Sequence, residues 1–323
     1  RARKFHETLK SLKEKCLNDS TVAGICMDYM QNLSLPKIPV QETFYLRQLT
    51  LNVFNIHNIS DEKAMFYLYH EGIAKKGPNE VSSFLLDYVN NVLSMDVKHL
   101  HLFSDGTGGQ NKNNTIVRLL LALVELGRFE TIHHYFPIRG HSFLPCDGDF
   151  GVVKRKIKKV DRVYTVKDYV EIILHSSKKQ DKFLVKLVNS SDVNDFKSWW
   201  PPLYKRNVVS TETMSRNIPR DDKIKFNIST FMEFIYSKEH QGQVVVKKFI
   251  GGLNQHTFHL KKVSAPPTLP TTLGVKEKVP INKKKINDIK KLRNYIPEEV
   301  FEEFYSEIFE WPTCDNEETE VLD

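Results

Sequence analysis

The sequence has little cysteine, and what it has is scattered. Its four cysteines are Cys16, Cys26, Cys146 and Cys314, and no two of them form a CxxC pair. Cysteine zinc sites are built from closely spaced pairs, so we do not expect one here. Four cysteines in 323 residues also do not make a disulfide scaffold. Scattered thiols are typical of a reducing, intracellular compartment.

Long apolar runs are missing as well. No stretch is long enough to cross a bilayer, and we see no segment with the pattern of a secretory signal peptide. We therefore expect no membrane partner. The chain begins with Arg1 rather than Met, and we expect it to be a piece of a longer protein with further residues upstream.

The remaining composition is that of an ordinary globular chain. It is 40% hydrophobic and 27% charged, and 323 residues are enough for about two domains. The formal net charge is +7 and the pI is near 9.0. This moderate excess of positive charge is compatible with a polyanionic partner but does not by itself require one.

One aspartate lies at the junction of an apolar run and a glycine-rich turn. The run 97–103 predicts a short strand, and the apolar segment 115–126 predicts a largely buried helix. Asp105 would then lie at the carboxyl end of a strand, where open α/β sheets place their ligands. A carboxylate there suits a hard cation such as Mg²⁺. The alternative is an ordinary turn, because Ser-Asp-Gly is common turn chemistry.

Two further positions repeat this pattern of an acid at the end of an element. Asp28 follows the apolar, β-rich run 21–27, and Asp147 or Asp149 opens a segment that begins acidic and ends basic, which favours a helix. The expected elements, in order, are strands over 21–27, 44–56 and 63–71, a helix over 80–93, a strand over 97–103, a helix over 115–126, a strand over 131–138 and a helix over 147–160. This order predicts an α/β fold.

Three motifs carry a resemblance to a known group of proteins. They are MDYMQNLSLPKIPVQETFYLRQL at 27–49, FSDGTGGQNKNN at 103–114 and RGHSFLPCDGDFG at 139–151. The sequence from about residue 20 to 160 resembles a large, mostly uncharacterised family of transposon-derived proteins abundant in insects and other arthropods. It departs from the family pattern at Tyr29-Met30, where a second Gln is usual, and at Thr107, where Cys is usual. Neither departure removes a carboxylate.

The resemblance implies a ribonuclease H-like core of the kind found in integrases and transposases, with a mixed five-stranded sheet flanked by helices. It implies a nuclease or strand transferase that acts on DNA phosphodiester bonds with two Mg²⁺ or Mn²⁺ ions. Asp28 would bridge both ions, Asp105 would hold one and Asp147 the other, with Asp149 as the alternative to Asp147. No small-molecule cofactor is expected, a homo-oligomer stays open, and the location would be nuclear.

A second class of function stays open beside the first. The chain could be a host-retained DNA- or chromatin-binding protein that keeps the fold without catalysis, and a structural or assembly role is a third reading. Intact carboxylates at all three motif positions favour the enzyme. Carboxylates dispersed in space would argue against it.

Four side chains could support the site. His141 could orient a water or a phosphate, and Gln110 and Asn111 could contact the cleaved strand or instead cap the helix that begins near Lys112. Glu71, at the end of the third expected strand, could support the site from behind or simply be exposed.

Basic side chains follow the third acid directly. Lys112 and this run could bind phosphates next to the site, although a basic run is often just a solvated helix face. The run consists of Lys154, Arg155, Lys156, Lys158 and Lys159.

The second half of the chain gives weaker signals. We expect domains at 1–160 (ribonuclease H-like) and 161–262 (a smaller α+β accessory domain), with strands near 183–188, 224–228 and 244–250. The segment 196–203 holds two tryptophans and two prolines and could be a rigid connector or a binding ledge. Residues 263–323 would contain a Pro/Thr-rich linker, a basic helix, an amphipathic helix and an acidic tail.

Overall fold

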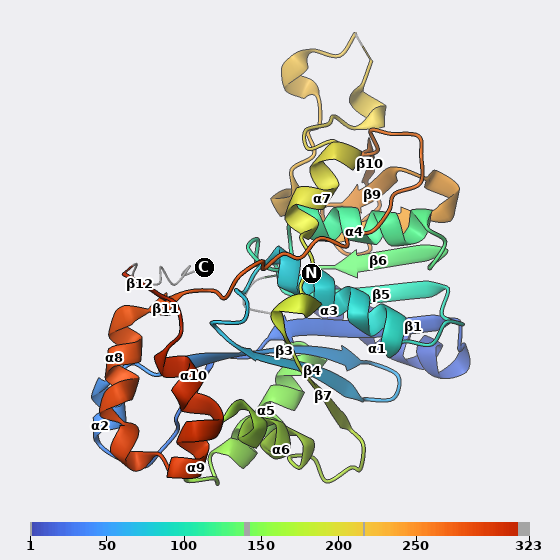
Figure 1. The fold of residues 1–323 in the computed structure, drawn as a ribbon. Coiled ribbons are helices and arrows are strands. Elements are labelled where there is room, and N and C mark those ends of the chain that lie inside the picture. Colours follow the sequence, from blue (N-terminus) through green and yellow to red (C-terminus); the bar gives the residue numbers. More distant parts are fainter. Residues whose placement is uncertain (1, 139–142, 216, 316–323) are drawn as a thin grey trace.

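A computed structural model describes residues 2–138, 143–215 and 217–315, and its centre is a ten-stranded mixed sheet. The strand order is β10-β9-β8-β6-β5-β1-β3-β4-β7, with β2 paired to β3 (Figure 1). The strands are β1 Val22–Tyr29, β2 Leu33–Leu35, β3 Leu49–Asn58, β4 Ala64–His70, β5 His99–Ser104, β6 Thr131–Tyr135, β7 Phe183–Leu187, β8 Glu233–Ser237, β9 Gln243–Lys247 and β10 Gln255–His259. A small second sheet pairs β11 Ile281–Asn282 with β12 Thr313–Cys314.

The centre of the sheet combines parallel and antiparallel pairs. β1, β5 and β6 are parallel neighbours, whereas β3 is antiparallel to both β1 and β4. β7 lies parallel to β4 at one edge, and β8, β9 and β10 continue antiparallel from β6 at the other. The first and the fifth strands of the chain are therefore adjacent, although 69 residues separate Tyr29 from His99 in the chain.

Helices cover the sheet on both faces. One apolar cluster lies under α3 (Pro78–Asn91), α4 (Asn114–Glu125) and α7 (Phe196–Leu203). A second cluster, on the opposite face, lies under the remaining long helices: α1 (Ala2–Asn18), α5 (Pro145–Ile157), α6 (Val166–Leu174) and α8 (Lys283–Lys291). Strands covered on both faces are apolar on both faces, which explains why β1 reads as one continuous apolar run.

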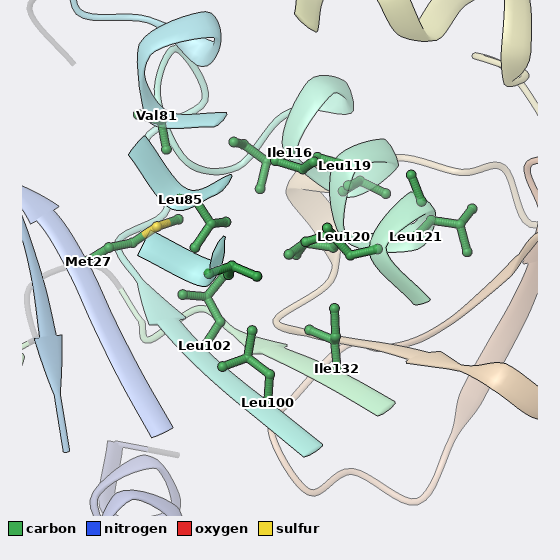
Figure 2. Packing of buried hydrophobic residues seen from close by; sticks show 14 of the residues in the cluster. Met27, Val81, Leu85, Leu100, Leu102, Ile116, Leu119, Leu120, Leu121 and Ile132 are labelled. Atoms are coloured by element: carbon green, nitrogen blue, oxygen red, sulfur yellow. The ribbon is translucent and has the colours of Figure 1, made fainter. Parts of the chain in front are cut away.

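Helix α4 shows why the local sequence folds as it does. All ten residues from Thr115 to Val124 are buried, because the helix packs against the sheet on one side and against α3 and α7 on the other. Figure 2 shows Leu119 and Leu120 of α4 facing Leu102 and Ile132 of the sheet. The helix starts where the Asn113 side chain accepts hydrogen bonds from two backbone N–H groups of the first turn.

The structure confirms the α/β prediction and a mixed sheet flanked by helices, but several predicted bounds were wrong. The sheet has ten strands rather than five. The predicted strand 44–56 starts only at Leu49, because Phe44 and Tyr45 lie in the short helix α2 (Glu42–Tyr45), where their side chains are 85% and 72% exposed. The predicted strand at 224–228 was also wrong, since Lys225 forms only an isolated bridge with Val209.

The strands of the predicted accessory region 161–262 lie in the same sheet as those of 1–160. β7 pairs with β4, and β8 pairs with β6. Within the sheet, therefore, no division falls at residue 160. The tryptophan- and proline-containing segment is the helix α7, whose Trp200 is buried in the first cluster.

The C-terminal segment folds back onto the first half of the chain. Figure 1 shows α8 with the short helices α9 (Glu298–Val300) and α10 (Ser306–Phe309) grouped beside α2 at one end of the molecule. Asp288 of α8 accepts hydrogen bonds from Arg47, and the Tyr295 hydroxyl donates to Glu42 at 2.7 Å. Most of the predicted acidic tail, 316–323, lies outside the described residues. No helix in the described parts of the chain has the length and apolarity to span a bilayer.

Candidate functional site

The strand register brings two of the three predicted carboxylates together. In the parallel pair β1–β5, Met27 is opposite Ser104, so Asp28 and Asp105 are the next positions along two adjacent strands. Side chains alternate between the faces of a strand, which puts Asp28 on the same face as Cys26. Cys26 belongs to the apolar cluster under α5. The two acids therefore meet at the carboxyl ends of neighbouring parallel strands.

The electrostatics of Asp28 show how close these charges are. Burial raises the pKa of Asp28, and the charge of Asp105 raises it further, to about 7. The charge of Asp147 adds a smaller upward contribution, while the Tyr29 backbone N–H and the Lys76 ammonium act in the opposite direction. Charges from the β5–α4 turn and from α5 thus both act on Asp28 of β1.

Asp105 is held rigidly by its own turn. Its carboxylate accepts hydrogen bonds from the Thr107 hydroxyl, from the Thr107 backbone N–H at 3.3 Å and from the Asn111 side-chain amide at 2.6 Å. Asn111 is fully buried, and its Oδ1 atom has no hydrogen-bond partner among the described residues. Asn111 is therefore a residue that positions Asp105. The alternative that Gln110 or Asn111 caps the next helix was wrong, because Asn113 does so.

The two acids at the start of α5 have different surroundings. Asp147 lies in the first turn, where its carboxylate accepts the Leu144 backbone N–H at 2.8 Å. Asp149 is 1% exposed and is bound on both oxygens, by His57 Nδ1 at 2.7 Å and Lys182 Nζ at 3.1 Å. Of the two, Asp147 is the one whose charge reaches Asp28. Asp149 instead links α5 to β3 and to the residue before β7.

One polar residue beside these acids escaped the sequence analysis. Asn55 of β3 is the direct cross-strand partner of Asp28 and is fully buried. Neither its Nδ2 nor its Oδ1 atom has a hydrogen-bond partner among the described residues. A buried amide without partners is costly, so Asn55 has unused hydrogen-bonding capacity directly opposite Asp28. The only local signal in the sequence was an asparagine between the apolar residues Phe54 and Ile56.

These residues differ from a preformed metal cage. Within the described residues, no group of three or more histidine, cysteine, aspartate or glutamate side chains lies close enough together to hold a metal ion. The donor chemistry around Asp28 nevertheless fits a hard divalent cation, since it consists of carboxylate and amide oxygens. The unpartnered Asn55 amide and the raised pKa of Asp28 are the two unsatisfied features of this group.

The other candidates are distributed around the site. Glu71 accepts the Thr50 backbone N–H at 2.7 Å and pairs with Lys285 of α8 at 2.7 Å, so it ties the C-terminal segment to the sheet. Lys112 donates to the Ser229 carbonyl at 3.2 Å and lies over the Phe136 ring. Gln110 accepts a hydrogen bond from Asn113 through its backbone carbonyl. His141 lies outside the described residues.

The basic run lies on the second half of α5 and just beyond it. Four of its cations are exposed, and Lys154 is half-buried with its ammonium 3.2 Å from Gln31 Oε1. No ion pair to a carboxylate involves any of the five in the part of the chain that the structure describes. The run is therefore a solvated positive face on the helix that carries Asp147.

Comparison with protein-family models identifies one match, which covers more than half of the chain. The model is described as a domain of unknown function (DUF7869) and matches residues 45–234. The chain belongs to the DUF7869 family. The matched DUF7869 region includes Asn55, Asp105 and Asp147, whereas Asp28 precedes it. No curated protein and no solved structure gives a significant match.

Proposed function

We propose that this chain is a transposase-derived, divalent-metal-dependent nuclease or strand transferase that acts on DNA phosphodiester bonds. The observation that carries the proposal is the β1–β5 register, which makes Asp28 and Asp105 neighbours at the ends of two parallel strands. Their proximity, with Asp147 nearby, raises the pKa of Asp28 to about 7 after the effect of burial. Carboxylates that repel one another in this way favour a bound cation, which would neutralise their charge.

The strand arrangement supports a ribonuclease H-like core within the larger sheet. The first three long strands form an antiparallel series, and β5 and β6 then lie parallel to β1 on its other side. In the ribonuclease H-like fold, acids at the ends of the first and fourth core strands act together. Asp28 and Asp105 would correspond to those two positions. β7 and β8–β10 would be additions at the two edges of such a core.

The residues proposed to hold Mg²⁺ or Mn²⁺ are Asp28, Asp105 and Asp147, with the Asn55 amide as a further oxygen donor. Two such ions, when bound, stabilise negative charge on the attacking and leaving oxygens of a phosphodiester. Asn111 and Thr107 keep the Asp105 carboxylate in one orientation, so little ordering is needed when substrate arrives. Asp28 would give up its proton as a cation binds, because the cation favours the ionised carboxylate.

The cations on the second half of α5 and just beyond it would contact the DNA backbone. Four of the five side chains are exposed, and all five follow Asp147 in the later part of α5 or directly after its end. Such a face neutralises phosphates without reading sequence, and its binding weakens as salt rises. DNA as the partner and a nuclear location belong to this proposal.

A second function is favoured by one observation. The described residues contain no closed group of three metal ligands. A protein that keeps the fold and the basic face but has lost catalysis would be a DNA- or chromatin-binding protein. It would bind DNA without cutting it.

The experiment is cleavage of labelled DNA in Mg²⁺ or Mn²⁺ by the parent chain and by Asp105→Asn. The matched control is Asp221→Asn, an exposed aspartate on a distant 3₁₀ turn. Cleavage by the parent and the control but not by Asp105→Asn supports the nuclease. Salt-sensitive binding by all three without cleavage supports the non-catalytic alternative, and equal cleavage by all three refutes the assigned site.

A further inference from the structure

An open cavity of about 320 Å³ lies beside the turn that carries Asp105. Its walls come from the start of α4 and from two loops more than 90 residues further along the chain. Lys112 and Arg206 contribute cations, Asn114 and Asn207 contribute amides, and Phe226 contributes an apolar wall. No carboxylate is among the described residues that line it. Its chemistry therefore suits an anion.

The cavity adjoins the proposed site through Lys112. A β-carbon built on Gly106, the residue after Asp105, would lie 4.0 Å from Lys112 Cδ. The Lys112 side chain is half-buried, and its ammonium donates to a carbonyl rather than to a carboxylate. Burial lowers the pKa of Lys112 to about 8, so a bound anion would stabilise its charged form.

A second, independent observation comes from Arg118 of α4. This side chain is fully buried, and its guanidinium lies 5.2 Å from the centroid of the Phe226 ring, which lines the cavity. Its Nη2 atom donates to the Lys205 carbonyl at 2.5 Å, but Nε and Nη1 have no partner among the described residues. A buried guanidinium without a carboxylate leaves an uncompensated positive charge.

The two arginines are also close enough to repel each other. Burial lowers the pKa of Arg118 to about 10, and the charge of Arg206 contributes in the same direction. Two cations, Lys112 and Arg206, therefore line the cavity, and a third, Arg118, lies against its Phe226 wall. An anion in the cavity would relieve this repulsion, which a neutral ligand would not do.

We propose that this cavity is a phosphate-binding subsite, which holds a backbone phosphate of a nucleic-acid strand that passes Asp105. The inference rests on the proposed function for its choice of a nucleic acid as the source of the phosphate. Arg206 would supply a charge-assisted hydrogen bond, and the amides of Asn114 and Asn207 would bind the remaining oxygens. The subsite would fix the position of the strand relative to the acids.

The test is binding of a short labelled oligonucleotide to the full chain in EDTA, followed by fluorescence anisotropy. Arg206→Gln removes an exposed cation of the cavity and leaves the core intact. The matched control is Lys10→Gln, which removes an exposed cation of α1 away from the cavity. We expect binding to weaken roughly tenfold in Arg206→Gln and to stay unchanged in Lys10→Gln. Equal binding by both variants, or no binding by the parent, would overturn the proposal.

A parallel titration with inorganic phosphate, followed by NMR at the Asn207 amide, distinguishes the two sources of the ligand. Arg206→Gln could weaken the binding of inorganic phosphate and leave the binding of the oligonucleotide unchanged. That result would refute a nucleic-acid strand as the source of the phosphate. The proposed function is tested separately, because binding in EDTA needs no metal. If Asp105→Asn abolishes cleavage while Arg206→Gln leaves oligonucleotide binding unchanged, the subsite is refuted and the proposed nuclease function is still supported.

Discussion

Replacing Asp28 with asparagine should stabilise the metal-free protein at neutral and alkaline pH. The pKa of Asp28 is raised from 3.8 to about 7, first by burial and then by the charge of Asp105. Because the folded state binds this proton more tightly than the unfolded state, the free energy of unfolding falls as the pH rises from 3.8 to about 7. The cost is absent below pH 3.8 and complete above about pH 7, where it amounts to about 4 kcal/mol.

Asp28→Asn removes this cost, because asparagine has nearly the same shape and cannot ionise. Its side-chain oxygen can still accept the Tyr29 backbone N–H that Asp28 accepts at 2.7 Å. In EDTA, urea unfolding of the parent and the variant should give equal stabilities near pH 4 and a more stable variant near pH 8. An Asp221→Asn control should show no such pH dependence. A variant that is less stable at pH 8, or a difference that does not change with pH, would refute the reasoning.

Three further predictions concern stability. Asp149→Asn should cost about 3–5 kcal/mol of the free energy of unfolding in urea, because it leaves Lys182 and the buried His57 without their carboxylate partner; a loss below about 1 kcal/mol, the size typical of exposed ion pairs, would argue against a buried ion pair. Leu120→Ala should cost about 2–5 kcal/mol, because Leu120 is fully buried between α4 and the sheet, whereas the exposed Leu253→Ala should cost little. Burial lowers the pKa of His70 to about 4, so the parent should lose about 3 kcal/mol as the pH falls from 6.5 to 4; an unchanged acid limb of the stability curve in His70→Gln would contradict this assignment.

Much of the central fold could be read from the sequence because the patterns are local. The strands at β1, β4 and β5 and the helices α3 and α4 are long apolar segments bounded by turns, and their bounds were predicted to within a few residues. The start of β3 was mispredicted because Phe44 and Tyr45 favour strands by composition. The attachment of β8–β10 to β6 was not visible, since it depends on pairing between segments about 100 residues apart.

The candidate site shows the same division between local and distant information. Each of the acids could be singled out by its place at the end of an element. Their meeting depends on the β1–β5 register, which no local pattern contains. The partners of Asp149 lie 92 and 33 residues away, at His57 and Lys182, so its role as a buried ion-pair residue could not be seen. Asn55 was missed because its significance comes from the residue opposite it on β1.

The most direct test of the central claim is Mn²⁺ binding, measured by electron paramagnetic resonance on the parent, Asp28→Asn and Asp105→Asn. In the proposed site these two acids, together with Asp147, hold a divalent cation. The parent and the Asp221→Asn control should take up Mn²⁺, and the two site variants should bind it at least tenfold more weakly, about 1.4 kcal/mol or more. Mn²⁺ binding that is unchanged in both site variants, or absent from the parent, would contradict the claim.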